Sequence, residues 1–433
     1  MKFASTHVKI RGMQITLSTG LTQQIEFNIP DEKLGAVLRP LSVTPPASPQ
    51  TIIEQAIKAP IGTQKLSQLV TPEQTVALLI DDVSRVTPGH IILPLLLAEL
   101  HEVGIPNEQI VIVMALGTHR PMTQKEIVQK VGPSIAQNYT IINESCDDVP
   151  LVYMGESGNG IPAYINQSAA KADVRVGIGQ IVPHMDAGFS GGAKIILPGV
   201  SGRQTVESFH AQEADIHENL VGNLNSPLRR DLEQFVADCV GLDFIVNIIP
   251  TREEDIFACV AGDFIEAHRA GVAIARDVYG IPTDRKYPIV LANSYPKDID
   301  MWQTANAIWG GELILEEGGT LIVLSDARDR HSAYANYPQR IGMDPDQLYQ
   351  QYKSGELDDL MTAIFAICIG RFKKRFEICL VSNGLTAVDA AEMGFTYFET
   401  VEQALAYAYQ KHPQPQGTAV LTHAGVSFPY LKS

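Results

Sequence analysis

The sequence has little of what marks secreted, membrane-spanning or disulfide-bonded proteins. Its five cysteines are scattered and form no CxxC pair, so we predict neither a disulfide framework nor a thiolate zinc site. The opening residues, MKFASTHVKIRGMQITLSTG, contain no apolar core of a signal peptide. The longest apolar run, residues 91–98 (IILPLLLA), is too short to cross a bilayer. We therefore expect a cytoplasmic protein with no membrane contact.

Positive charge is also scarce. The chain carries 33 Lys and Arg against 49 Asp and Glu, a formal net charge of −16, which argues against a general nucleic-acid-binding surface. Hydrophobic residues make up 45% and charged residues 19%, with no low-complexity tract, so the chain has the composition of a globular protein with a large core. The 433 residues allow two large domains or three of average size.

Short apolar segments alternate with helical patterns along the whole chain. In the first part, buried strands are predicted at residues 75–81, 110–116, 174–179 and 244–249. A helical period at residues 91–103, ended by Gly104, lies between the first two strands and indicates a βαβ unit with a parallel sheet. The opening segments, 8–17 and 24–27, are typical of a hairpin instead.

A second set of alternations follows a turn-rich join at residues 280–286. Strands are predicted at residues 288–292, 320–324, 376–381 and 418–421, and helices at 299–309, 357–370 and 401–410. We therefore predict an α/β protein of two domains with parallel-rich sheets, 1–280 and 287–433. Clefts between domains often bind cofactors and substrates, so an interdomain active site is expected.

The segment from residue 181 to 210 is the richest in chemically useful residues. Its five glycines are Gly188, Gly191, Gly192, Gly199 and Gly202. Such a loop can wrap a phosphate with backbone N–H groups or serve as a plain turn, and it matches neither common nucleotide motif. Lys194 could act as a nucleophile or covalent anchor, or could simply extend to water. His184 and His210 could be bases or metal ligands, although a single histidine is more often structural.

Polar residues also follow two predicted strands. Asp82, Val83, Ser84 and Arg85 come after the first strand, and His119 follows the next, in GTHR. Ligands bind beyond the carboxyl ends of parallel strands, and Arg85 offers a fork for a carboxylate or phosphate. Asp82 and Ser84 could instead cap the following helix.

These segments together resemble the lactate racemase family. The resemblance rests on ALGTHRPMT, on DDVSR near a strand end, on the segment from His184 to His210, and on the opening FNIPDEKLGAVLRP. It covers most of the chain. It implies two α/β domains with the site between them and a nickel pincer nucleotide, a pyridinium-3,5-bisthiocarboxylate mononucleotide that holds Ni(II) by sulfur, carbon and sulfur.

The resemblance also implies a role for each candidate residue. Lys194 corresponds to the lysine that is tethered to the cofactor through a thioamide, and His210 to the histidine that ligates nickel. His119 and His184 correspond to the paired acid/base histidines. The stretch from Asp82 to Arg85 corresponds to cofactor and substrate contacts, to which Gly191 and Gly192 are added as candidates for cofactor binding. The implied partners are a small 2-hydroxy acid and the enzymes that make the cofactor; the oligomeric state is left open.

The implied reaction is chemically consistent with two histidines. Inverting C2 of a 2-hydroxy acid by proton abstraction is difficult, because the carboxylate makes the α-hydrogen a poor acid. Transfer of that hydrogen as hydride gives a planar keto acid, which can receive hydride on either face. Each histidine would then serve as base for one enantiomer and as acid for the other.

One segment departs from the family pattern. Gln303 corresponds to a substrate-contacting glutamine, but Asn306 stands where the lactate enzymes carry a lysine, and Trp302 lies beside the pair or packs in the core. We therefore expect a larger or polyhydroxylated 2-hydroxy acid in place of lactate, with Arg85 as its carboxylate anchor. Two alternatives stay open: a zinc hydrolase with His119, His184 and His210 as ligands, and a non-catalytic binder of the cofactor or of a small acid.

Overall fold

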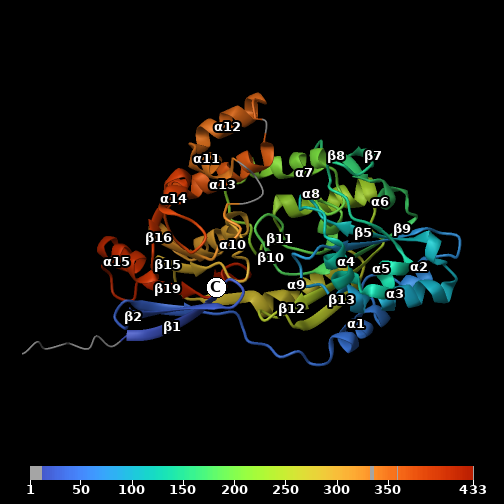
Figure 1. Cartoon of the computed structure of the whole chain (residues 1–433), viewed down its shortest axis with the longest axis horizontal. Coiled ribbons are helices and arrows are strands. Elements are labelled where there is room, and N and C mark those ends of the chain that lie inside the picture. Colours follow the sequence, from blue (N-terminus) through green and yellow to red (C-terminus); the bar gives the residue numbers. More distant parts are fainter. Residues whose placement is uncertain (1–11, 332–335, 358, 433) are drawn as a thin grey trace, which may run out of the picture. The chain divides into compact units, whose positions relative to one another are not determined.

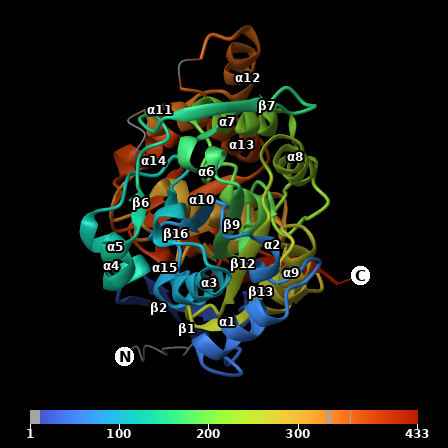
Figure 2. The same ribbon diagram turned by 90° about the vertical axis from the view of Figure 1, so that its right-hand side faces the viewer.

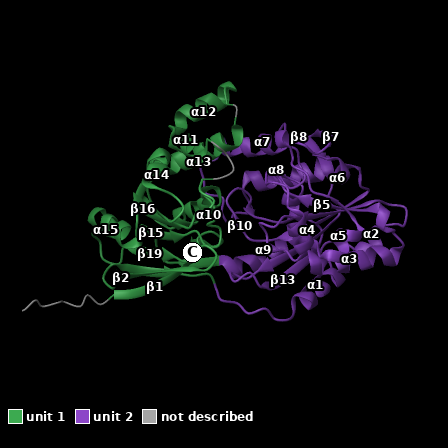
Figure 3. Cartoon of the chain, viewed as in Figure 1, with its two compact units in different colours: residues 1–40, 280–433 green, residues 41–279 purple. Residues whose placement is uncertain are grey.

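The protein is described by a computed structural model that covers residues 12–331, 336–357 and 359–432. The chain divides into two compact units (Figure 3). Unit 1 comprises residues 1–40 and 280–433, and unit 2 comprises residues 41–279. Within the described ranges, no helix combines the length and the apolar character needed to cross a membrane.

Unit 2 is built on a six-stranded sheet with the strand order β13-β12-β9-β4-β5-β6. Figure 1 labels β5, β9, β12 and β13 of this sheet. The strands are β4 (Val76–Asp81), β5 (Ile110–Ala115), β6 (Thr140–Ile142), β9 (Val174–Gln180), β12 (Phe244–Pro250) and β13 (Ile256–Gly262). All pairings are parallel except that of β13 with β12. Smaller strands form the pairs β7 (Leu151–Glu156) with β8 (Pro162–Asn166) and β10 (Pro183–His184) with β11 (Gly188–Phe189).

Helices cover this sheet because the strands are apolar on both of its faces, with nearly every residue of β4 and β9 buried. The helices are α1 (Pro49–Lys58), α2 (Leu66–Leu69), α3 (Gly89–Val103), α4 (Gln124–Val131), α5 (Pro133–Asn138), α6 (Gln167–Lys171), α7 (Arg203–His210), α8 (Pro227–Phe235) and α9 (Glu266–Tyr279). Figure 2 shows α1 and α9 beside β13. One continuous core joins apolar side chains of α1, α3 and α4 to β4, β5, β9 and β12.

The strand order places a topological switch point between β4 and β9. From β4, the chain adds β5 and β6 on one side and β9 and β12 on the other. Ligands of open α/β sheets bind in the crevice at such a point, beyond the carboxyl ends of the strands. Asp81 ends β4 and Gln180 ends β9, so the segments that follow these residues occupy the favoured position.

Unit 1 has a second six-stranded sheet, which is parallel throughout, in the order β18-β17-β16-β15-β19-β3. Its strands are β3 (Leu34–Leu38), β15 (Tyr287–Asn293), β16 (Leu315–Ser325), β17 (Glu377–Ser382), β18 (Thr396–Phe398) and β19 (Thr418–Leu421), with a separate pair of β14 (Gly280–Thr283) and β20 (Phe428–Leu431). Its helices are α10 (Met301–Glu312), α11 (Tyr337–Gly342), α12 (Pro345–Ser354), α13 (Leu360–Arg375), α14 (Ala387–Met393) and α15 (Val401–Lys411).

The hairpin of β1 (Gly12–Thr19) and β2 (Gln23–Pro30) belongs to unit 1. Its apolar side chains pack with those of α15 against the sheet, as the core that joins Ile15 and Phe27 to Ile289 and Val420 shows. The hairpin prediction is confirmed where it can be seen, and residues 8–11 lie outside the described residues.

The predicted α/β class with parallel-rich sheets is confirmed, and each predicted buried strand is present. The prediction that residues 1–40 belong to an N-terminal domain 1–280 is wrong for the described part of that segment. β3 pairs in parallel with β19, so the segment completes the sheet of the C-terminal half. Patterning within one segment cannot show this, because the partner strand lies almost 400 residues further along the chain. An active site between the domains stays a prediction.

Candidate active site

The turn after β4 is shaped by its first residue. Asp82 is buried, and its Oδ1 accepts hydrogen bonds from the backbone N–H (2.9 Å) and from the hydroxyl of Ser84. Helix α3 begins only at Gly89, after Pro88, which gives no side-chain cap. Asp82 and Ser84 therefore do not cap this helix, and the capping interpretation is wrong.

The same turn presents Arg85 and Val83. Arg85 is partly exposed and donates to the hydroxyl (3.0 Å) and the carbonyl oxygen (3.1 Å) of Ser84. It forms no ion pair with a carboxylate of the described chain, so its guanidinium can bind an anionic ligand. Val83 is 41% exposed at the tip of the turn and can contribute apolar contact only.

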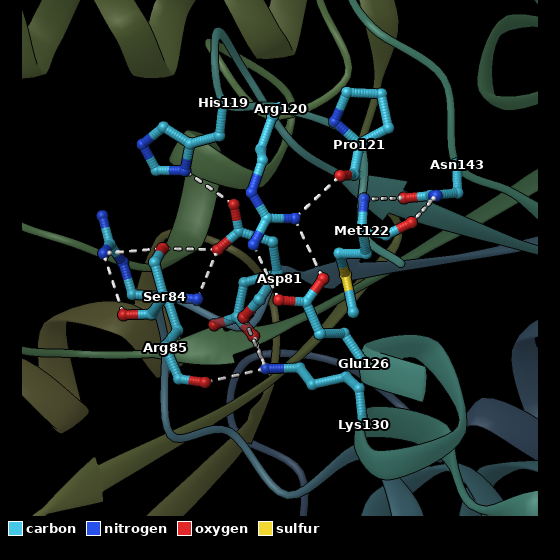
Figure 4. Close-up of polar contacts among 11 residues, drawn as sticks. Asp81, Ser84, Arg85, His119, Arg120, Pro121, Met122, Glu126, Lys130 and Asn143 are labelled. Atoms are coloured by element: carbon cyan, nitrogen blue, oxygen red, sulfur yellow. Dashed lines mark hydrogen bonds and ion pairs between the residues drawn. The ribbon is translucent and has the colours of Figure 1, made fainter. Parts of the chain in front are cut away.

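Asp82 and His119 form a hydrogen-bonded pair (Figure 4). His119 follows β5 in a turn where Gly117 has a positive φ of 56°. Nδ1 of His119 lies 2.6 Å from Oδ2 of Asp82. Burial alone would raise the pKa of the Asp82 carboxyl, but the hydrogen bond and charge of His119, helped by Ser84 and Arg85, lower it well below its usual range. An ionised carboxylate only accepts, so Nδ1 of His119 carries the proton of this hydrogen bond, and in the uncharged imidazole Nε2 is then the nitrogen with the lone pair. The His119 side chain is 40% exposed, which leaves that lone pair accessible as a base.

The glycine-rich segment lies against the same edge of the sheet. The 3-10 helix η2 (Gly192–Ile195) contacts β4 and β9, and Gly191 and Gly192 both have positive φ, 77° and 58°. The side chain of Asn247 accepts a hydrogen bond from the backbone N–H of Gly192 at 2.8 Å. A β-carbon at Gly191 would come within 2.7 Å of the same Asn247 oxygen, so this loop requires glycine.

A buried polar network that includes α8 hydrogen-bonds to the glycine-rich loop at Ser190. Arg229 on α8 is fully buried and donates to Glu233 (2.7 Å) and to the ring of His268 (2.7 Å). The ring of His268 in turn hydrogen-bonds the carbonyl oxygen of Ser190 at 2.9 Å. His268 thus has a structural role in this network.

Lys194 is desolvated and lacks a direct partner. No hydrogen bond or ion pair joins its Nζ to another described residue. Burial lowers the pKa of Lys194 to about 8; Asp186 and Glu213 oppose this shift, and Arg229 and Arg85 add to it. About a tenth of the amine is therefore uncharged at pH 7, far more than for an ordinary lysine, and this is the form that acts as a nucleophile or forms a covalent bond.

His184 and His210 both lie near Asp186. Nδ1 of His184 accepts a hydrogen bond from the backbone N–H of Asp186 at 3.2 Å, and the Asp186 carboxylate lies 3.6 Å from that nitrogen and 3.9 Å from Nδ1 of His210. Nδ1 of His210, at the end of α7, also makes a short hydrogen bond to Glu213. Burial lowers the pKa of His210 to about 4 and raises that of Glu213 to about 8. The imidazole is therefore uncharged at neutral pH, as metal binding requires.

These residues fit the nickel cofactor implied by the family resemblance. In the part of the chain that the structure describes, Asp186, His210 and Glu213 bring three possible ligand atoms within 4.8 Å of one another. Imidazole is a suitable ligand for nickel, and Lys194 supplies an amine for a covalent link. His119 and His184 do not join His210 in this group. The three-histidine zinc site is therefore not supported.

The other predicted residues lie on α10 in unit 1. Asn306 donates to the carbonyl oxygen of Gln303 at 2.8 Å, and its own Oδ1 accepts a hydrogen bond from Nζ of Lys297 at 3.3 Å. A cation thus lies beside the neutral residue 306, which the sequence analysis did not anticipate. Trp302 stacks on Phe365 with ring centroids 4.3 Å apart, as the packing interpretation predicts.

Sequence reasoning missed several residues that hold this site. They are Lys130, Asp186, Glu213, Arg229 and Asn247. Asp186 stands two residues after His184, and Glu213 three after His210, so local spacing could have indicated both. The other three act on distant segments, and no pattern in the sequence marks them.

The chain resembles known proteins over most of its length. Residues 21–220 match the lactate racemase N-terminal domain. The chain is 30% identical over 384 residues to the lactate racemase of Lactiplantibacillus plantarum, covering 86% of this chain and 89% of the relative. It is 29% identical over 320 residues to the lactate racemase of Thermoanaerobacterium thermosaccharolyticum, covering 72% and 75%.

Solved structures show the same relationship. The lactate racemase apoprotein from Thermoanaerobacterium thermosaccharolyticum matches with a TM-score of 0.87 and 26% identity, covering 97% of this chain and 100% of that one. A crystal structure of a Thermotoga maritima protein matches with a TM-score of 0.67 and 19% identity, covering 88% and 98%. The latter match supports the fold alone.

Proposed function

The chain belongs to the lactate racemase family, which makes it a racemase or epimerase, and from this premise we propose that it inverts C2 of a 2-hydroxy acid by reversible hydride transfer to a nickel pincer nucleotide. The observation that carries the proposal is the Asp82–His119 pair in the same unit as the desolvated Lys194, whose Nζ has no partner among the described residues, and His210, whose side chain is only 12% exposed. A general base, a covalent anchor and a metal ligand are the protein groups that this reaction needs.

Lys194 and His210 would hold the cofactor. Lys194 would form the covalent link, because its lowered pKa makes the amine available, and His210 would supply a nitrogen ligand to nickel. The glycines of the loop would let backbone N–H groups approach the nucleotide phosphate. When bound, the group supplies an acceptor for the hydride of C2.

His119 and His184 would move the hydroxyl proton. Nε2 of His119 is ready to accept it, because Asp82 holds the Nδ1 proton and stabilises the imidazolium that results. His184 would serve the opposite enantiomer. Two bases are required, because the hydroxyl groups of the two enantiomers point in different directions when the carboxylate is held in one place.

Arg85 would anchor the substrate carboxylate, since its guanidinium has no carboxylate partner among the described residues. For the remainder of the substrate we propose a larger or polyhydroxylated acid. Asn306 offers an amide where a lysine stands in the lactate enzymes, and Lys297 lies next to it. An amide and an ammonium together can bind hydroxyl groups along a sugar-acid chain.

The first test is the mass and metal content of protein made together with the cofactor-synthesis enzymes. We expect a mass increment that peptide mapping places on Lys194, with about one nickel per chain. Lys194→Arg, which keeps the charge but cannot form the thioamide, should lack the increment. Unmodified Lys194 in protein that binds no nickel would overturn the cofactor assignment.

The second test is the reaction itself. Loaded protein is offered D-lactate and D-gluconate in D₂O, and products are analysed by proton NMR. Hydride transfer keeps protium at C2, whereas proton abstraction would introduce deuterium. We expect inversion with retained protium and a preference for D-gluconate; a clear preference for D-lactate would contradict the substrate proposal. Loaded protein that turns over no 2-hydroxy acid would favour a non-catalytic binder.

A further inference from the structure

Helix α4 carries a buried lysine whose ammonium group is fully engaged. Lys130 is only 6% exposed, and its Nζ donates to Oδ1 of Asp81 (2.8 Å) and to the backbone carbonyl oxygens of Asp82 (2.9 Å) and Arg85 (3.0 Å) (Figure 4). An ammonium group has three donors, and here each has an acceptor at hydrogen-bonding distance. A buried lysine with a complete set of partners is held in one position.

The three acceptors of the Lys130 ammonium group have different structural roles. The carboxylate of Asp81 neutralises the buried charge, as any buried ion pair requires. The two carbonyl groups contribute nothing to that neutralisation. They belong to the first and last residues of the turn that carries the site, which is also closed by the hydrogen bond from the N–H of Arg85 to the carbonyl of Asp82 (3.2 Å). Lys130 therefore fixes both ends of this turn.

The same helix also holds the second loop of the site. Glu126, one turn before Lys130, makes two hydrogen bonds with Arg120 (2.9 and 2.7 Å) and accepts another from the backbone N–H of Thr123 (2.7 Å). Arg120 is the neighbour of His119 in the chain. Helix α4 thus contacts the loop of Asp82 through one side chain and the loop of His119 through another (Figure 4).

We propose that Lys130 is a positioning residue for the acid/base pair: by fixing the turn of residues 82–85 against α4, it holds the Asp82 carboxylate on Nδ1 of His119 and so keeps Nε2 of His119 as the base. The kinetic part of this inference rests on the proposed function. The structural part does not, because it concerns only the hydrogen bonds that join Lys130 to the turn and Asp82 to His119.

The first test is NMR of the apoprotein labelled with ¹⁵N-histidine, at a pH high enough for the imidazole rings to be uncharged. In the wild type, His119 should show a protonated Nδ1 and an unprotonated Nε2. Lys130→Met, which removes the three hydrogen bonds, should give a mixture of the two neutral tautomers. The matched control is Lys125→Met, the same change at an exposed position of the same helix, which should leave the His119 signals unchanged.

A second variant separates positioning from simple charge neutralisation. Lys130→Met leaves Asp81 as an unpaired buried charge and could unfold the protein for that reason alone. The double variant Lys130→Met with Asp81→Asn removes both charges and leaves an acceptor for the hydroxyl of Thr87, which donates to Asp81 at 2.6 Å. We expect it to melt close to the wild type, with the tautomer mixture retained.

In loaded enzyme the double variant should lose about 100-fold in kcat with little change in KM, because small displacements of a catalytic group reduce the chemical step. Wild-type kcat and a fixed Nδ1–H tautomer in the double variant would overturn the inference and leave Lys130 as a counter-ion only. If the wild type racemises no 2-hydroxy acid, the proposed function fails, yet the NMR comparison still decides the role of Lys130.

Discussion

At the scale of single residues, Lys194 works against the stability of the apoprotein. Its pKa falls from the ordinary value of 10.5 to about 8 because burial disfavours the ammonium form. Below about pH 8 the folded state therefore bears the full penalty of a buried charge. Between pH 8 and 10.5 the unfolded chain binds more protons than the folded one, so the penalty disappears as the pH rises.

We predict that Lys194→Met raises the melting temperature of the apoprotein at pH 7 by at least about 2 °C, the shift that about 1 kcal/mol produces in a domain of this size. The gain should shrink toward zero at pH 10. Thermal unfolding of both proteins at the two pH values measures it. Lys171→Met, at an exposed position, is the control; an equal gain there, or a loss at position 194, would contradict the argument.

His119 and Asp82 should depend on each other in catalysis. His119→Gln removes the base, and we expect kcat of loaded enzyme to fall by about 10²–10⁴-fold, the range typical of general acid–base catalysis. Asp82→Asn should also lower kcat, because an amide can place its N–H toward Nδ1 and so favour the wrong tautomer. His90→Ala, an exposed histidine on α3, should leave kcat unchanged. Full activity in His119→Gln would exclude this residue as a base.

At the scale of elements, the glycine-rich loop has little tolerance for side chains. Gly191→Ala would place a β-carbon 2.7 Å from Oδ1 of Asn247 at a φ of 77°. We expect this change to reduce the free energy of unfolding by about 1–3 kcal/mol and to impair attachment of the cofactor to Lys194. Urea unfolding and intact mass measure the two effects.

Gly158→Ala is the matched control for this change. A β-carbon at Gly158 meets no atom within 4 Å, and its φ is not in the left-handed region. It should be nearly neutral in both measurements. Equal effects of the two variants would show that the loop does not require glycine at position 191.

The elements also show what a sequence can predict. Buried strands such as β4 and β9 were predictable, because the signal is a run of apolar residues within the strand itself. The site candidates His119 and His210 were predicted from the family resemblance and from their positions, His119 after a predicted strand and His210 in the glycine-rich segment. Lys130 was not predictable, because its partners lie 45 to 49 residues away, and a lysine near the end of a helix usually faces water.

At the scale of the whole molecule, the division of the chain into two units predicts which fragment can fold alone. Residues 41–279 contain the whole of the first sheet and its core, so a fragment of that length should fold alone. We expect a cooperative urea transition and dispersed NMR signals from it. A fragment of residues 1–280 would add β3 without its partner strand β19, and the hairpin β1–β2 without the sheet on which it packs, so it should be more prone to aggregate. The reverse order of behaviour would contradict the assignment of residues 12–40 to unit 1.

The interrupted sheet of unit 1 has a consequence for synthesis on the ribosome. β3 emerges early, but its partner β19 begins at Thr418. Unit 2 is complete once residue 279 has been made, and Thr418 lies 418 − 279 = 139 residues further along the chain. At about 5–20 residues per second, synthesis of this stretch takes roughly 7–28 s. Throughout that interval β3 has no partner strand and the apolar face of the hairpin has no sheet to cover, so the cell's chaperones would have their longest access to this protein at its N-terminal segment.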